Sequence, residues 1–250
     1  MGFCIVSTGW QCESWIAQTL ESVEEQSVDD WRIQIVYDPS TDAGADLIQA
    51  WCEDRDARWR CAINTEQRFA VRNQVEAVQA LDPANTDIIV WLDLDGDRFA
   101  HPEVLAHLAD AYADGTTLLT YGSYRPEPDK GTSTMATPFP PDVVAANSYR
   151  HQTRHVHCHF NHLRSMSGKL FWSIPDDQYH WPDGRWYAAG ADYILMIAGL
   201  ELAGGRYKCL TEELMIYNHA NPLSDNLVRV DDCTANIVHF LERPPLDPLP

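Results

Sequence analysis

Short apolar runs alternate with amphipathic stretches over the first half of the chain. The runs are rich in β-branched and aromatic residues, as buried strands are, and the stretches between them repeat apolar side chains every three or four positions, as helices do. The expected strands are 3–7, 31–37, 58–64, 88–92 and 117–121. The expected helices lie at 14–23, 45–51, 71–81 and 102–112, with Ser14, Asp42 and Pro102 at three helix starts. This alternation predicts a mainly parallel sheet with helices on both faces.

The regular pattern stops after the fifth expected strand and returns only late in the chain. Residues 122–141 are rich in Pro, Gly, Ser and Thr, which predicts an irregular excursion over the surface. Further on, 191–202 has the apolar spacing of a helix, and 206–210 and 213–217 have the composition of short strands. The final segment, 244–250, is Pro-rich and is not expected to need an ordered structure.

These patterns predict one α/β domain made of two halves. The first half covers 1–121 and the second covers 122–250, in which the whole excursion is placed at 122–150. A chain of 250 residues that is 45% hydrophobic can bury a core of this size. Residues 88–92 form a strongly β-branched apolar run, which is typical of a strand at the centre of a sheet.

Charge and cysteine content narrow the class of protein. The formal net charge of −19 repels nucleic acid and phosphate unless a divalent cation or local positive charge is present. Seven cysteines without a paired spacing are typical of free thiols in a reducing compartment. The sequence has no apolar run long enough to cross a membrane, and its first residues enter a strand without a basic leader. We therefore expect a soluble, cytoplasmic protein.

One stretch departs from the acidic balance, because 143–175 contains no Asp or Glu. Its basic side chains are Arg150, Arg154, Arg164, Lys169, His151, His155, His157, His159 and His162. This composition predicts a neutral to basic face on an acidic protein. Three of the histidines, at alternate positions from 155 to 159, could hold zinc on a strand, although no finger-like Cys or His pair supports such a site.

Three carboxylates, those of Asp93, Asp95 and Asp97, come directly after the apolar run at 88–92. The carboxyl ends of the strands are where open α/β sheets bind ligands. The three charges repel one another, and Mn²⁺ or Mg²⁺ would neutralise them and bridge the oxygens of a diphosphate. The alternative is a solvated acidic turn that caps the following segment.

A further carboxylate, Asp38, ends the second expected strand. At that position an Asp commonly accepts hydrogen bonds from a ribose or a base. A turn-forming Asp before Pro39 is an equally good interpretation of the local sequence.

Four segments together resemble the family 2 glycosyltransferases of the GT-A fold. Members typically show an Asp-Asp-Gly-Ser-Thr-Asp turn, an Ala-Arg-Asn segment and a Leu-Asp-x-Asp-Asp segment in this order. The matching segments are Val6-Ser7-Thr8, Val36 to Asp42, Val71-Arg72-Asn73 and Trp91 to Asp97, and the departures are Tyr37, Pro39 and Val71. The resemblance implies a Rossmann-like, mixed, mainly parallel sheet that binds a nucleotide-diphosphate sugar in its first half and an acceptor in its second.

The resemblance also implies roles for single residues. The residues expected at the donor are Thr8, Asp38, Arg72, Asn73 and Asp93. Asp95 would be the principal ligand of Mn²⁺ or Mg²⁺, with Asp97 beside it. His219 falls near the position where many GT-A enzymes place a histidine on the metal, and the alternative for it is a surface histidine in a loop.

The segment Gly190-Ala191-Asp192-Tyr193 resembles the Glu-Asp segment of the family, with Ala191 in place of the Glu. The resemblance implies that Asp192 is the general base of an inverting reaction. A carboxylate suits this role, because it can remove the proton of an acceptor hydroxyl while the sugar C1 is attacked from the face opposite the diphosphate. The alternative role for Asp192 is a helix cap.

The acceptor side is less defined. The candidates are Arg154, Arg164, Trp172 and Trp186, and the tryptophans are equally well explained as core residues. The segment 201–222 is similar to viral and microbial stand-alone variants of the family, so the cytoplasm would be that of the source cell or of an infected host.

Taken together, the sequence predicts a metal-dependent, inverting hexosyl- or pentosyltransferase with a UDP-sugar as the favoured donor. Its acceptor could be a small molecule, a glycan or a lipid-linked compound. The acid-free stretch leaves a second acceptor open, a hydroxymethylated base of viral DNA. An inactive module that binds nucleotide or protein is the alternative from another class.

Overall fold

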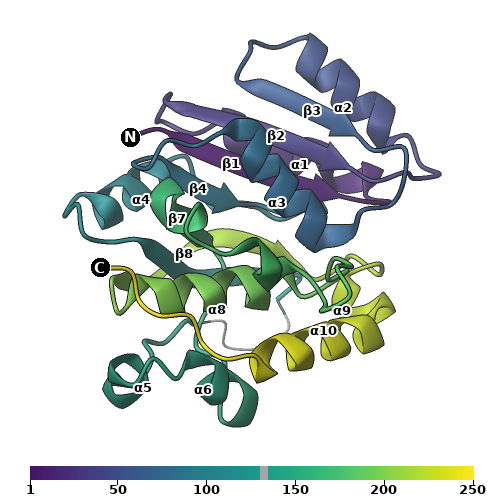
Figure 1. The fold of residues 1–250 in the computed structure, drawn as a ribbon. Helices are drawn as coiled ribbons and strands as arrows, with labels where there is room; N and C mark the ends of the chain where they lie inside the picture. Colours follow the sequence, from purple (N-terminus) through teal and green to yellow (C-terminus); the bar gives the residue numbers. More distant parts are fainter. Residues whose placement is uncertain (130–134) are drawn as a thin grey trace.

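The fold is built on one eight-stranded sheet that both halves of the chain share. The structure is a computed structural model, and it describes residues 1–129 and 135–250. The strands run in the order β3-β2-β1-β4-β7-β6-β8-β5 (Figure 1). Their bounds are β1 (Phe3–Gly9), β2 (Trp31–Tyr37), β3 (Trp59–Ile63), β4 (Ile88–Trp91), β5 (Arg98–Phe99), β6 (Leu119–Glu127), β7 (Arg164–Ser167) and β8 (Tyr207–Asn218).

The direction of the strands changes at β7. Strands β3, β2, β1 and β4 are mutually parallel, whereas β7 is antiparallel to both of its neighbours, β4 and β6. On the far side, β6 and β8 pair in parallel and the short β5 is antiparallel to β8. The expected mixed, mainly parallel α/β sheet is therefore confirmed.

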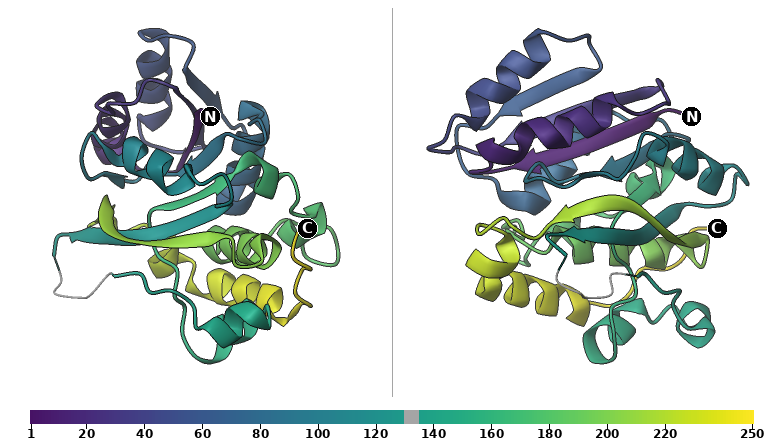
Figure 2. Two further views of the ribbon diagram at one scale, coloured as in Figure 1. Left: turned by 90° about the vertical axis from the view of Figure 1, so that its left-hand side faces the viewer. Right: turned by 180° about the vertical axis from the view of Figure 1, so that it is seen from behind.

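Alternation of side chains along the central strands sets the two faces of this sheet. In β1, Cys4 and Val6 belong to one buried apolar cluster, whereas Phe3 and Ile5 belong to the other. Strand β4 divides its four buried residues between the same two clusters. A sheet that is buried on both faces needs helices on both, which explains the layered arrangement seen in Figure 2.

Helices pack on each face through their apolar stripes. The face that carries Phe3 is covered by α1 (Glu13–Glu24), α2 (Gly44–Glu53) and α4 (Val104–Tyr112). The opposite face is covered by α3 (Phe69–Leu81), α7 (Gly168–Phe171) and α8 (Ala191–Ala203). The remaining helices are α5 (Pro141–Ala145), α6 (Tyr149–His155), η1 (Asp176–Tyr179), α9 (Asp225–Val228) and α10 (Val230–Glu242). Of these, α6, η1 and α10 pack against α8.

The helices of the first half form where the sequence predicts them, but the starts expected at Ser14, Asp42 and Pro102 are displaced, because α2 begins at Gly44 and α4 at Val104. Helix α1 begins at Glu13, and Ser14 does not cap it. Asp42 instead accepts a hydrogen bond from the Glu13 amide at 2.9 Å, and the Glu13 carboxylate accepts one from the Ala43 amide at 2.6 Å. Each of these two carboxylates, about thirty residues apart in the sequence, thus accepts a hydrogen bond from a free backbone amide at the start of the other's helix.

The second half contains more regular structure than expected. Strand β6 continues to Glu127, so the excursion predicted from 122 begins later, and residues 130–134 within it lie outside the described residues. The two strands expected at 206–210 and 213–217 are a single strand, β8, paired along β6. Helices α9 and α10 were not expected at all. The length of β8 is set by its pairing with β6, a long-range contact that the local composition does not reveal.

The Pro-rich end of the chain is ordered, contrary to expectation. The Leu249 amide donates to the Leu202 carbonyl at 2.8 Å, and the Leu246 amide donates to the Glu201 carboxylate at 3.1 Å. Arg206 in turn donates to the Leu249 carbonyl at 2.7 Å. The segment is therefore held against α8 by its backbone groups, which a composition rule cannot foresee.

The arginines of the acid-free stretch do not supply free positive charge to the neutral to basic face that its composition predicts. Arg150 is buried and pairs with the buried Glu201 at 2.7 Å, and Arg154 pairs with Glu242 at 2.6 Å. Arg164 is buried as well. The carboxylates that neutralise these cations come from other parts of the sequence, so the absence of acids within the stretch was misleading.

The alternating histidines do not lie on a strand either. Helix α6 ends at His155, and 156–161 has no regular structure. No cluster of three or more His, Cys, Asp or Glu in the described residues could hold a metal ion. All seven cysteines are free thiols, and all belong to the described residues. Within those residues, no helix has the length and the apolar character needed to cross a membrane.

The Arg150–Glu201 pair yields a stability prediction. Arg150 also donates to the Phe240 carbonyl and to Gln178, so it joins α6 to α8, α10 and η1. We expect Arg150→Met to lower the free energy of unfolding by about 3–5 kcal/mol, because Glu201 stays buried without its counter-ion. Urea unfolding of the purified variant measures this loss.

The exposed Arg154–Glu242 pair supplies the matched control. Its side chains are 33% and 50% exposed, so we expect Arg154→Met to cost less than about 1 kcal/mol. An equal loss of unfolding free energy in the two variants would show that the buried pair contributes no more to stability than the exposed one.

Candidate active site

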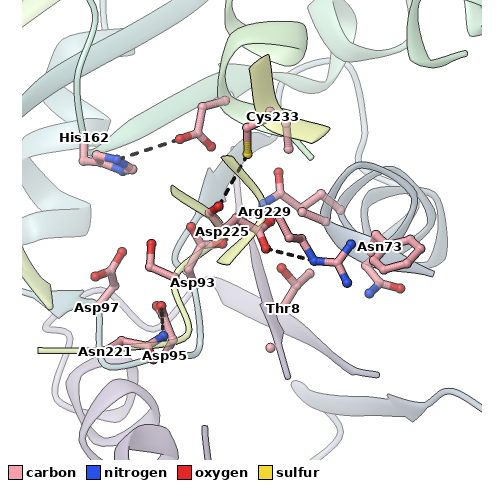
Figure 3. Close-up of a pocket in the computed structure, with 18 of the residues that line it drawn as sticks. Thr8, Asn73, Asp93, Asp95, Asp97, His162, Asn221, Asp225, Arg229 and Cys233 are labelled. Atoms are coloured by element: carbon pink, nitrogen blue, oxygen red, sulfur yellow. Dashed lines mark hydrogen bonds and ion pairs between the residues drawn. The ribbon is translucent and has the colours of Figure 1, made fainter. Parts of the chain in front are cut away.

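A cavity of about 420 Å³ opens at the carboxyl ends of β1, β2 and β4. Its other walls come from α3, from the loop before β7 and from the starts of α8, α9 and α10, so both halves of the chain contribute (Figure 3). Nine of the residues predicted from the sequence line it: Thr8, Asp38, Asn73, Asp93, Asp95, Asp97, Arg164, Asp192 and His219.

Four other predicted residues do not line this cavity. Arg72 pairs with Glu76 at 2.8 Å on the surface of α3. Arg154 pairs with α10. Trp172 donates to the Pro83 carbonyl at 2.9 Å, and Trp186 stacks on Tyr179. In the structure all four therefore make local packing or ion-pair contacts outside the cavity.

The acidic turn after β4 is held by the last residue of β8 and by the segment that follows this strand. Gly96 has φ 105°, and a Cβ there would lie 2.5 Å from the Asn218 side chain, so only glycine fits. Asn218 donates to the Asp95 carbonyl at 2.7 Å and through its backbone to Asp97 at 2.9 Å. Asn221 donates to the Asp95 carboxylate at 2.7 Å. These contacts fix the direction of both carboxylates.

Burial makes these carboxylates costly to ionise. It raises the pKa of Asp95, and it raises that of Asp97 well above the usual range, with Asp95 and Asp93 adding repulsion. One oxygen of Asp97 is buried and has no hydrogen-bond partner among the described residues. Asp95, Asp97 and His219 all border the cavity, but they do not form a group that could hold a metal by themselves.

Arg164 is the charge at the centre of the site. It lies on β7 and only 2% of its side chain is exposed. One nitrogen, Nη1, donates to Asp192 Oδ1, and the other, Nη2, lies 3.5 Å from Asp93 Oδ2. One guanidinium therefore connects the carboxylate at the end of β4 to the carboxylate at the start of α8.

The two carboxylates on Arg164 differ in their titration. Burial opposes ionisation of Asp192, but the guanidinium outweighs it and lowers the pKa of Asp192 below its usual range. For Asp93 burial dominates, and the neighbouring Asp192 and Asp95 reinforce it, so its pKa is raised. Asp192 is consequently the carboxylate that is held ionised at neutral pH.

His162 lies on the other side of Asp192. Its Nε2 is 4.0 Å from Asp192 Oδ2, and its ring packs against both Tyr124 and Tyr217. Burial, followed by the nearby Arg164, lowers the pKa of His162 to about 3. The imidazole is therefore neutral, and Arg164 is the cation that balances Asp192.

Asp38 organises the loop that precedes α3. Its carboxylate accepts hydrogen bonds from Asn64 at 2.8 Å, from the Arg68 amide at 3.1 Å and from the Phe69 amide at 2.9 Å. Only 2% of Asp38 is exposed. The oxygens of Asp38, which were predicted to accept hydrogen bonds from the donor, are thus largely occupied by hydrogen bonds from within the protein.

Several residues of the cavity were not predicted. They include Phe69, His162, Asn221, Asp225, Arg229 and Cys233. Three of them stand on or next to α9 and α10, and α10 has a visible signal. Its buried or part-buried apolar residues, Cys233, Ile237, Phe240 and Leu241, have helical spacing. The helix was therefore predictable, whereas its place beside the acidic turn was not.

Comparison with known proteins agrees with this geometry. The sequence model described as Glycosyl transferase family 2 matches residues 4–173. The chain therefore belongs to the family 2 glycosyltransferases. No curated protein matches it.

Solved structures share the fold at low sequence identity. S. aureus TarS 1-349 in complex with UDP is 14% identical, with a TM-score of 0.65 over 96% of this chain and 64% of that one. Mannosyltransferase PcManGT from Pyrobaculum calidifontis, in complex with GDP-Man and Mn²⁺, is 17% identical, with a TM-score of 0.59 over 95% and 62%.

A third similar structure is glucosyl-3-phosphoglycerate synthase from Mycobacterium tuberculosis, in complex with Mn²⁺, UDP and phosphoglyceric acid. It is 15% identical, with a TM-score of 0.59 over 97% of this chain and 79% of that one. The chain spans less than two thirds of the TarS chains, so these likenesses define the GT-A fold and not the reaction partners.

The central pairing yields a pH-dependent stability prediction. Folding lowers the pKa of Asp192, so its stabilising effect is complete above the ordinary value of about 3.9 and is lost as the pH falls through the lowered value. We expect Arg164→Met to cost about 2 kcal/mol at pH 7, less than a fully buried pair, because 38% of the Asp192 side chain is exposed.

At pH 4 the loss should be smaller, because Asp192 without its counter-ion takes up a proton in the folded variant. Urea unfolding of the wild type and of the variant at both pH values measures the difference, and Arg164→Lys, which keeps a charge, serves as the control. A loss of equal size at pH 7 and pH 4 would mean that Arg164 contributes packing alone.

Proposed function

We propose that the chain transfers a sugar from a UDP-sugar to an acceptor hydroxyl with inversion at the anomeric carbon, using a divalent metal. The observation that carries this proposal is the cavity itself. It contains four of the five residues expected at the donor, Thr8, Asp38, Asn73 and Asp93, together with those expected at the metal and at the base, at the carboxyl edge of the sheet. In this proposal residues 1–121 bind the donor, and 122–250 form the acceptor side.

The donor end is assigned to Thr8, Asn73, Asp93 and the loop that Asp38 organises. Asp38 then contributes mainly by fixing the backbone of this loop, with its remaining acceptor capacity available to the nucleoside. UDP is the favoured nucleotide because TarS and the glucosyl-3-phosphoglycerate synthase are both known in complexes with it. GDP-Man in the mannosyltransferase keeps GDP-sugars as the second choice.

The metal is assigned to Asp95, with Asp97 and His219 at the same edge of the cavity. Carboxylate oxygens suit Mn²⁺ and Mg²⁺, and the buried, unpartnered oxygen of Asp97 fits a nearby cation. Because the described residues provide no group of three ligands, an ion here would need phosphate oxygens of the donor as well. When bound, it would supply positive charge to the diphosphate leaving group.

Asp192 is assigned as the general base. Arg164 occupies Oδ1 and keeps the group ionised, so Oδ2 is the oxygen left to accept a proton. In the proposed reaction the acceptor hydroxyl loses its proton to Asp192 while its oxygen forms a bond to C1 of the sugar. The bond from C1 to the diphosphate oxygen breaks on the opposite face, and its electron pair leaves with the nucleoside diphosphate.

The acceptor is proposed to be a small or neutral hydroxyl compound. The cavity wall near Asp192 includes Cys158, Phe160 and Tyr193, which are uncharged at neutral pH. No observation favours a base of viral DNA, because Arg150, Arg154 and Arg164 are all paired with carboxylates. The free thiols support a reducing compartment such as the cytoplasm.

The test is a hydrolysis panel with UDP-, GDP- and dTDP-sugars. We expect release of nucleoside diphosphate from one donor in Mn²⁺ or Mg²⁺. The rate of release should be at least about a hundredfold lower in EDTA or in Asp95→Asn, which is the usual loss when one group that stabilises charge in the transition state is removed. Arg154→Gln, which changes a paired surface arginine, is the control and should retain activity.

Absence of turnover with every donor and metal, together with donor-dependent thermal stabilisation, would favour an inactive binding module instead. Absence of both turnover and stabilisation would contradict the proposal altogether.

A further inference from the structure

Arg229 is a cation at the cavity that the proposed mechanism does not use. It immediately precedes α10, and 19% of its side chain is exposed. Its guanidinium carbon lies 4.0 Å from the centre of the Phe69 ring, in a cation–π contact. Figure 3 shows it between Asp225 and Asn73, on the side of the cavity where Thr8 also lies.

The guanidinium of Arg229 makes ion pairs but no hydrogen bond within the described residues. Its closest carboxylates are those of Asp225, at 3.5 Å, and Asp232, at 3.9 Å, which are ion-pair distances beyond the usual hydrogen-bond length. Its backbone amide is engaged with Asp225, but its guanidinium makes no hydrogen bond to any described residue. A fork of donors at a cavity wall is well suited to a carboxylate or phosphate of a ligand.

Phe69, on which Arg229 rests, is held in an unusual conformation. Its φ is 64°, a left-handed value that costs a non-glycine residue about 1–2 kcal/mol. The Asp38 carboxylate holds this conformation by accepting the Phe69 amide at 2.9 Å. Asp38 therefore fixes Phe69, and the Phe69 ring in turn fixes the guanidinium at the cavity.

The charge balance of the cavity also calls for a cation. Its lining includes six carboxylates, those of Asp38, Asp93, Asp95, Asp97, Asp192 and Asp225, and a nucleoside diphosphate would add further negative charge. Among the described lining residues the arginines are Arg164 and Arg229. Arg164 is already paired with Asp192 and Asp93, so Arg229 is the arginine of the two that is able to bind a ligand.

We propose that Arg229 binds the diphosphate of the donor, and that Asp225 holds the guanidinium in place until the phosphate replaces it. This inference rests on the proposed function, since it needs a nucleoside diphosphate in the cavity. It adds a role for the start of α10, which closes the donor side of the cavity from the C-terminal half of the chain.

The experiment is calorimetric titration of UDP and of GDP in MnCl₂ into the wild type, Arg229→Gln, Arg229→Lys and Asp225→Asn. Binding of the corresponding nucleoside, uridine or guanosine, is measured by ligand-observed NMR. Arg154→Gln is the matched control, because Arg154 also pairs with a carboxylate associated with α10 but lies outside the cavity. Thermal melting of each variant verifies that it is folded.

We expect Arg229→Gln to weaken binding of the nucleoside diphosphate about 10- to 100-fold, the range of a charged hydrogen-bonding contact, and to leave nucleoside binding within about twofold. Arg229→Lys should lie between the two, because it keeps the charge without the fork. Asp225→Asn should bind as tightly as the wild type or more tightly, because it removes a competitor for the guanidinium.

Two results would overturn the assignment while leaving the proposed function intact. One is diphosphate binding by Arg229→Gln within about twofold of the wild type. The other is an equal loss of diphosphate and nucleoside binding, which would place the effect on the Phe69 loop. Failure of the wild type to bind either UDP or GDP would instead overturn both proposals.

Discussion

The ion pairs of Arg164 are the interaction on which the rest of the site depends. Strand β7 inserts this arginine, antiparallel, beside β4, so that its guanidinium lies between the end of β4 and the start of α8. Without it, two carboxylates contributed by different halves of the chain would face each other in a poorly solvated space. The bridge allows Asp192 to remain ionised there, and it sets the distance between the acidic turn and α8.

The same constraint explains the distribution of charge around the cavity. An acidic protein that binds a nucleoside diphosphate must supply cations locally. Arg164 is occupied by the protein's own carboxylates, which leaves the proposed metal at Asp95 and the guanidinium of Arg229 for the ligand. The arginines of the acid-free stretch, by contrast, join helices to one another, and Arg150 does so from a buried position.

Much of the fold follows from local patterns, whereas the site follows only in part. The continuous apolar run at 88–92 and the adjoining Asp93 to Asp97 were sufficient to place the acidic turn, because strand and turn are contiguous. The role of Arg164 was predicted as acceptor binding, yet its partners lie 28 and 71 residues away in the sequence. Arg229 meets Phe69 from the other end of the chain. Such contacts depend on tertiary packing, which spacing does not encode.

The most direct test of the account is the rate at which Asp192→Asn releases nucleoside diphosphate from the donor that the wild type hydrolyses fastest, with donor affinity measured in parallel. The substitution keeps the shape of the side chain and removes its basicity. The account predicts a rate about 10²- to 10⁴-fold lower, the usual contribution of a general base, with donor affinity unchanged within a few fold. A rate within about threefold of the wild type would contradict it, since Asp192 would then be only an ion-pair partner of Arg164.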